Sequence, residues 1–292
     1  MSLLKKFTSF FAGKPKLDIA SRFEILREAV SGTMSEFYKV REHSTGRTLG
    51  LKVLDLEKQQ FFDSRFTGMT RPKEGEIAMS LTHPCIVRTI EHGLVTTGQQ
   101  YVLMEYLDGR GLNSLIVDRD PMLEGKQLIL LRQMADALAC VHDAGYIHRD
   151  ICPRNFIAAP DCRSCKLIDF GLTLPAKPEF MAPGNRTGTP NYMAPEIVRR
   201  RATDQRVDIF SLGVTGFRLL AYELPWAALE GTGRDALTHD TLAPSDILQK
   251  RPGLNPELGE LIMSCIERDP RLRPESAREL LARLQKIKKM EA

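Results

Sequence analysis

The sequence lacks any run of about 18 consecutive apolar residues, the length that a membrane-crossing helix needs. It also lacks a secretory signal, because no small-residue cleavage pattern follows a clean apolar run near its start. The formal net charge is only +4, which is too small to indicate nucleic acid as a partner. We therefore expect a cytoplasmic protein without a transmembrane segment.

Cysteine is scarce, since six cysteines are scattered through 292 residues and form no disulfide framework. This usage is typical of a reducing cytoplasm. Cys162 and Cys165 have C-x-x-C spacing, but no second ligand pair at a spacing suitable for zinc is obvious. We interpret the pair as part of a hairpin turn.

The first residues differ from the rest of the chain. Residues 1–16 carry four lysines and no acid, and their apolar residues recur at helical spacing. We treat residues 1–20 as a basic amphipathic N-terminal segment. Such a segment can contact an anionic membrane surface, pack on its own domain or fray, and we favour the last two.

Further along, the pattern changes from strands to helices. Strand-like stretches cover residues 23–54, 86–94 and 99–107, and a helical stretch lies around 72–81. Longer helical patterns follow at 126–145, 207–221, 257–267 and 275–289. The sequence predicts an α+β fold with a small β-rich part, 21–104, that carries one main helix, and a larger, mostly helical part, 105–292. Such an architecture places a cleft at the junction.

Five polar residues suit phosphoryl transfer. Lys52 ends a predicted strand and Glu74 lies on the next helix, and a buried lysine needs such a carboxylate. Asn155 and Asp169 offer the oxygen ligands that suit Mg²⁺. Asp150 is then left to orient an acceptor hydroxyl.

Eight motifs occur in one order: LGLKVL with Lys52, the helical glutamate Glu74, MEYL, HRDICPRN, DFG, GTPNYMAPE, DIFSLG and RDPRLRP. In these motifs, residues 23–285 resemble a eukaryotic-type Ser/Thr protein kinase. The resemblance implies one domain, 21–285, with the bilobal protein-kinase fold. It also implies transfer of the γ-phosphoryl group of ATP, with Mg²⁺, to Ser or Thr hydroxyls of protein substrates.

The resemblance assigns the same five residues their roles. Lys52 would hold the α- and β-phosphates, braced by Glu74, and Asp150 would orient the substrate hydroxyl. Asn155 and Asp169 would bind Mg²⁺. The residues implied to bind the nucleotide are Ala29, Val30, Gly32, Phe37, Gly50, Lys52, Met104, Glu105, Leu107 and Ile157.

Other implied roles are structural or regulatory. Glu196 should pair with Arg273, and Asp208 should anchor the catalytic loop. Arg149 is the residue that, in members controlled by phosphorylation, pairs with a phosphate on the activation segment. Of the candidate phosphorylation sites, Thr173 and Thr187, we favour Thr187 because Arg186 is its neighbour.

The sequence departs from the family pattern at two motifs. The glycine-rich loop reads Val30, Gly32 and Ser35, which is one glycine of three, so we expect weaker ATP binding or slower transfer. The lysine of the catalytic loop is replaced by Cys152. Arg154 stands two residues further on, and we expect it to supply the missing charge. We interpret Cys152 as an inert thiol rather than a redox handle.

Three functions remain open. Thr189 in GTPNYMAPE favours Ser/Thr as the acceptor, and the five polar residues favour an active kinase. The depleted glycine loop and Cys152 are the reasons to consider a pseudokinase that binds nucleotide or acts as a scaffold. A small-molecule phosphotransferase ranks last, because the APE segment for peptide docking is present.

Overall fold

The computed structural model describes residues 15–31, 35–226 and 235–292. Most of the predicted N-terminal segment and Gly32 of the predicted phosphate loop lie outside these residues, and the side chains of Ala29 and Val30 are likewise not described. The described chain divides into two compact units. The first comprises the residues up to Thr82 and Val87–Leu107, and the second comprises His83–Ile86 and Asp108–Ala292.

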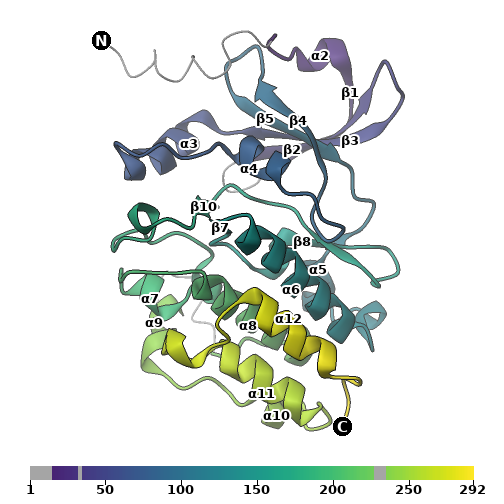
Figure 1. The fold of residues 1–292 in the computed structure, drawn as a ribbon. Helices are drawn as coiled ribbons and strands as arrows, with labels where there is room; N and C mark the ends of the chain where they lie inside the picture. Colours follow the sequence, from purple (N-terminus) through teal and green to yellow (C-terminus); the bar gives the residue numbers. More distant parts are fainter. Residues whose placement is uncertain (1–14, 32–34, 227–234) are drawn as a thin grey trace. The chain divides into compact units, whose positions relative to one another are not determined.

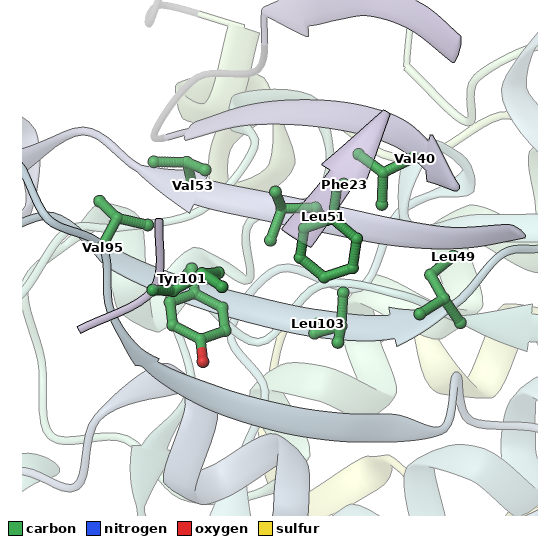
Figure 2. Close-up of a cluster of buried hydrophobic side chains, with 9 residues drawn as sticks. Phe23, Val40, Leu49, Leu51, Val53, Val95, Tyr101 and Leu103 are labelled. Atoms are coloured by element: carbon green, nitrogen blue, oxygen red, sulfur yellow. The ribbon is translucent and has the colours of Figure 1, made fainter. Parts of the chain in front are cut away.

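The first unit is a five-stranded antiparallel sheet with helices, in the order β1-β2-β3-β5-β4 (Figure 1). Its elements are α2 (Ile19–Arg22), β1 (Phe23–Ser31), β2 (Ser35–Glu42), β3 (Thr48–Leu54), α3 (Leu56–Asp63), α4 (Glu74–Ser80), β4 (Thr89–Leu94) and β5 (Gln100–Glu105). Figure 2 shows apolar side chains gathered on this sheet: Phe23, Val40, Leu49, Leu51, Val53, Val95, Tyr101 and Leu103. Each large apolar side chain buried in this way contributes about 1.5–3 kcal/mol. This core fixes the strands that carry the first group of candidate residues.

Helix α3 is absent from the sequence-based expectation. Its sequence, LEKQQFFD, is mostly polar and has no clear apolar face, so periodicity does not reveal it. The signal that does exist is the N-cap, because the Asp55 carboxylate accepts a hydrogen bond from the Lys58 N–H at 3.1 Å. Phe62 is the residue of α3 that enters the core.

The second unit is mostly helical. Its strands are short: β6 (Arg110–Gly111), β7 (Tyr146–Ile147), β8 (Phe156–Ala158), β9 (Cys165–Leu167) and β10 (Leu174–Pro175). Its α-helices are α5 (Leu112–Val117), α6 (Gln127–Asp143), α7 (Pro195–Val198), α8 (Arg206–Ala221), α9 (Asp235–Thr241), α10 (Ile247–Lys250), α11 (Pro256–Cys265) and α12 (Ala277–Lys286). Helix α8 is buried along nearly all of its length. Helices α6 and α11 pack against it, and α12 packs against α6.

Close helix packing in the second unit depends on two glycines of α8. A Cβ on Gly213 would lie 2.5 Å from the Cβ of Cys265, and one on Gly216 would lie 2.8 Å from the Cδ1 of Ile262. Both contacts come from α11, so the glycines let this helix approach closely.

The predicted helices and strands are present, with ends that differ by a few residues. The Cys162–Cys165 pair lies at the β8–β9 hairpin, where the sequence predicts a turn. Within the part of the chain that the structure describes, no helix has the length and apolar character needed to cross a bilayer.

Candidate active site

Lys52 and Glu74 form a buried ion pair in the first unit. Lys52 lies on β3 and Glu74 opens α4, and the lysine Nζ is 2.5 Å from the Glu74 Oε1. The two side chains are only 6% and 4% exposed. Removing one partner of such a pair leaves a buried charge uncompensated, which costs about 3–5 kcal/mol. The pair therefore holds the Lys52 ammonium group in a fixed position on β3.

The candidate nucleotide-binding residues of the first unit include a tightly packed group. Gly50 pairs with Met104 across β3 and β5, and Phe37 pairs with Lys52 across β2 and β3. A Cβ on Gly50 would lie 2.8 Å from the Phe37 ring and 3.2 Å from the Met104 Cγ. Glycine at position 50 therefore makes room for the aromatic ring at position 37.

The other candidate nucleotide-binding residues lie on several segments. Ala29 and Val30 belong to β1, where Val30 pairs with Phe37. Glu105 ends β5, its N–H donates to the Arg88 carbonyl at 3.0 Å, and Leu107 is the last residue of the first unit. Ile157 lies on β8 of the second unit.

Asp150 is held by two segments of the second unit. The Asn155 Nδ2 donates to the Asp150 carbonyl at 2.7 Å and to its Oδ2 at 3.0 Å. The Thr189 N–H and hydroxyl both donate to the Asp150 Oδ1, at 2.8 and 2.7 Å. The carboxylate is thus fixed in direction while the residue stays partly exposed.

Arg154 reaches the same threonine. Its Nη2 donates to the Thr189 Oγ1 at 3.1 Å, so one hydroxyl links the guanidinium to the Asp150 carboxylate. The Cys152 Sγ lies 3.8 Å from that hydroxyl. Burial, followed by the Asp150 charge, raises the pKa of the Cys152 thiol, which favours the protonated and unreactive form.

Asp208 fixes the backbone ahead of Asp150. Its two carboxylate oxygens accept the N–H groups of His148 and Arg149, both at 2.7 Å, and one also contacts the His142 Nε2 at 2.9 Å. Burial alone would raise the pKa of Asp208, but the hydrogen bonds and the nearby histidines bring it below its usual value. Arg149 has a φ of 68°, which a non-glycine residue adopts only when its surroundings enforce it.

Asn155 and Asp169 provide oxygen donors of the kind that Mg²⁺ prefers. The Asn155 amide nitrogen is engaged with Asp150, so its Oδ1 points elsewhere. The Asp169 Oδ1 accepts the Gly171 N–H at 2.9 Å, which orients this carboxylate at the start of the DFG turn. The donor set fits a hard dication.

Glu196 and Arg273 form a bidentate pair deep in the second unit. The guanidinium donates to both Glu196 oxygens, at 2.7 and 2.9 Å, and the Arg273 side chain has no exposed surface. The pair joins α7 to the segment that precedes α12. Because it is buried, its role is to stabilise the second unit.

The activation-segment candidates are both buried. Thr187 is 7% exposed and Thr173 has no exposed surface. The Arg149 Nη2 donates to the Asn185 carbonyl at 3.0 Å. Within the described residues, the Nε and Nη1 of Arg149 are buried without a hydrogen-bond partner.

Two residues of this region were not singled out from the sequence. Gly188 has a φ of +127°, and a Cβ there would lie 2.7 Å from the Arg149 carbonyl oxygen. The signal that points to it is its place beside Thr189. His142 lies on α6, and nothing in the helical pattern reveals that its ring contacts Asp208, 66 residues away.

Comparison with known proteins gives a consistent result. Residues 23–284 match the family model described as protein kinase domain. Pkn2 of Myxococcus xanthus, named a serine/threonine-protein kinase, is 33% identical over 275 residues, which are 90% of this chain and 32% of that protein. Pkn3 of the same organism is 28% identical over 292 residues, which cover 97% of this chain and 52% of pkn3. PknJ of Mycobacterium tuberculosis is 30% identical over 264 residues, which cover 88% of this chain and 44% of PknJ. The chain thus spans about a third to a half of the length of these relatives.

Proposed function

The chain belongs to the protein kinase domain family, and on that premise we propose that it transfers the γ-phosphoryl group of ATP to Ser or Thr hydroxyls of protein substrates. The observation that carries the proposal is the arrangement of Asp150. Its carboxylate is fixed by Asn155 and Thr189 and can accept the proton of an incoming hydroxyl. Lys52, braced by Glu74, would contact the phosphates.

Asn155 and Asp169 would hold Mg²⁺, which when bound offsets the negative charge of the phosphates. The chain's own residues do the rest. Asp208 holds the backbone that presents Asp150, and Thr189 keeps the Asp150 carboxylate from rotating. Such preorganisation accounts for most of the catalysis in phosphoryl transfer.

Arg154 takes over the role of the lysine that Cys152 replaces. The support is its hydrogen bond to Thr189, which places a permanent positive charge next to the residue that contacts Asp150. Removing one such preorganised donor typically lowers the rate constant about 10²–10³-fold.

Moving the positive charge from position 154 to position 152 by mutation tests this role. We expect Arg154→Ala to lower kcat and Cys152→Lys to restore part of it in the Arg154→Ala background. Arg163→Ala, an exposed arginine outside the loop, is the control. Arg154→Ala and Thr189→Val should also combine non-additively if they act through one contact. Full activity of Arg154→Ala would contradict the assignment.

The activity itself is tested by the mass of the intact chain and of a generic protein substrate after incubation with Mg·ATP. Mass gained in multiples of one phosphate by the wild type, but not by Asp150→Asn, supports the proposal. ATP binding without any turnover would instead favour the pseudokinase alternative, for which the glycine-poor loop gives a reason.

We further propose that phosphorylation of Thr187 regulates this activity. The support is the buried Arg149 guanidinium, whose burial lowers its pKa and whose Nε and Nη1 lack partners within the described chain. A phosphate on the segment that Arg149 already contacts at Asn185 would accept these donors. Peptide mapping of the phosphorylated chain should find Thr187, and Thr187→Val should remove that site, whereas phosphate found on Thr173 alone would contradict the proposal.

A further inference from the structure

His83, Cys85 and Asp136 bring three potential metal ligands together in the second unit. Their ligand atoms all lie within 4.8 Å of one another, and no other such group of three or more His, Cys, Asp or Glu residues occurs in the described chain. All three side chains are partly exposed. None of them has a role in the phosphoryl transfer proposed above.

The group is assembled by backbone contacts that need no ligand. His83 and Cys85 belong to the segment His83–Ile86, and the Leu167 N–H of β9 donates to the Cys85 carbonyl at 2.9 Å. Ile86 and Leu167 also form a parallel bridge. Asp136 lies on α6, which packs against β9 as well as against α8 and α12. The turn that carries His83 and Cys85 is therefore held against β9, and Asp136 is held on a helix that packs on the same strand.

The histidine ring is oriented within the group. The Cys85 N–H donates to the His83 Nδ1 at 3.2 Å, which turns the His83 Nε2 toward the Asp136 Oδ2, 3.3 Å away. When a dication binds at Nε2, the ring proton moves to Nδ1 and this one long hydrogen bond is lost. Burial, followed by the Asp136 charge, raises the pKa of the Cys85 thiol to about 11, so coordination also releases the thiol proton to solvent.

We propose that the His83 Nε2, the Cys85 Sγ and a carboxylate oxygen of Asp136 bind one zinc-type divalent ion, with water as the fourth ligand. Nitrogen, thiolate and carboxylate donors are the set that Zn²⁺ and Co²⁺ take in four-coordinate sites, whereas Mg²⁺ and Ca²⁺ avoid sulfur. The thiolate and the carboxylate together balance the charge of the ion. Lys166 is a nearby cation with two opposite effects: its charge lowers the Cys85 pKa, which favours the thiolate, but it also repels a metal ion.

The alternative is that His83 and Asp136 form only a hydrogen-bonded pair that fastens the segment to α6. The two cases differ in one bond, because a metal–thiolate bond forms only in the first. Cys85 provides that bond, and Cys140 on α6 is the matched control as the other cysteine that is partly exposed.

The test is a Co²⁺ titration of the tag-free, chelator-treated full chain. We expect one equivalent to bind with a near-ultraviolet thiolate-to-cobalt band that Zn²⁺ abolishes and Mg²⁺ does not. Cys85→Ala should lose the band, and His83→Gln should weaken Co²⁺ binding by more than the 10–100-fold typical of outer-shell partners. Cys140→Ala should bind like the wild type.

Two results of the Co²⁺ titration would overturn the proposal, and the first needs only the wild type, so it holds whether or not the variants fold. Absence of the thiolate band at stoichiometric Co²⁺ would do so, as would a band that persists in Cys85→Ala. A second measurement is the urea midpoint followed by tryptophan fluorescence, which Zn²⁺ should raise in the wild type and in Cys140→Ala but not in Cys85→Ala. An equal rise in all three chains would place the ion elsewhere and refute the assignment.

Discussion

Replacing Arg273 with alanine should destabilise the second unit by about 3–5 kcal/mol, the range measured when one partner of a buried ion pair is removed. The structure supports this range. The Arg273 guanidinium has no exposed surface and makes two hydrogen bonds to Glu196, which is itself 7% exposed. It also donates to the carbonyls of Glu267 at 2.7 Å and Arg206 at 3.1 Å, and lies 4.9 Å from the Phe210 ring centroid. Alanine leaves all of these acceptors without their donor.

The assay is urea or thermal unfolding followed by tryptophan fluorescence. Trp226 is the chain's one tryptophan, and it is buried in the second unit, so the signal reports on that unit. At about 2–4 °C per kcal/mol for a domain of this size, the midpoint should fall by roughly 6–20 °C. Such a loss is a large share of a typical domain stability of about 5–15 kcal/mol.

Arg271 is the matched control. It lies two residues away and pairs with Asp269, but its side chain is 82% exposed, so Arg271→Ala should leave the midpoint nearly unchanged. The reasoning is refuted if Arg273→Ala and Arg271→Ala unfold at the same midpoint.

Three further predictions follow from the same unit. Gly188→Ala should strongly lower phosphate transfer and also destabilise the second unit, because a Cβ there clashes with the Arg149 carbonyl at 2.7 Å and the φ of +127° disfavours alanine; wild-type activity and stability would contradict this. Asp208→Ala leaves the N–H groups of His148 and Arg149 without their acceptor, so chemical denaturation should show a loss of about 2–6 kcal/mol, and a loss below 1 kcal/mol would argue that water replaces the carboxylate. Burial raises the pKa of Cys265 to about 12, while an unfolded cysteine titrates near about 8.5. As pH rises from about 8.5 to 12, the Cys265 thiol therefore ionises in the unfolded chain but stays protonated in the folded chain. This difference lowers the free energy of unfolding by up to about 1.4 kcal/mol per pH unit. Cys265→Ala should show a correspondingly shallower fall in a denaturation series above pH 8.5, and an unchanged slope would contradict the assignment.

The parts of the fold that depend on periodicity and on short motifs could be predicted from the sequence. The pairing of Lys52 with Glu74 follows from the cost of burying a lysine alone, and the structure brings the two together. Helix α3 could not be predicted, because its sequence is mostly polar and has no clear apolar face. The helix is stabilised instead by a capping aspartate and one buried phenylalanine.

Contacts between distant segments were the harder part of the site. The sequence suggested that Arg154 replaces a lysine, but its partner Thr189 lies 35 residues away and has no spacing relation to it. Asp136 likewise comes about 50 residues after Cys85, and no short motif connects them. Such contacts are set by the tertiary fold, which local patterns do not encode.

The bond between Asp208 and the catalytic loop has a consequence for the growing chain on a ribosome. The loop at His148 and Arg149 is held by a carboxylate 60 residues further along the chain. At about 5–20 residues per second, synthesis needs roughly 3–12 s to reach α8 after the loop has been made. During that interval the N–H groups of His148 and Arg149 lack the Asp208 carboxylate, so we expect the catalytic loop to take its final shape only after α8 has been made. Helix α8, which carries no catalytic group, thus sets the earliest point at which we expect the nascent chain to form its active loop.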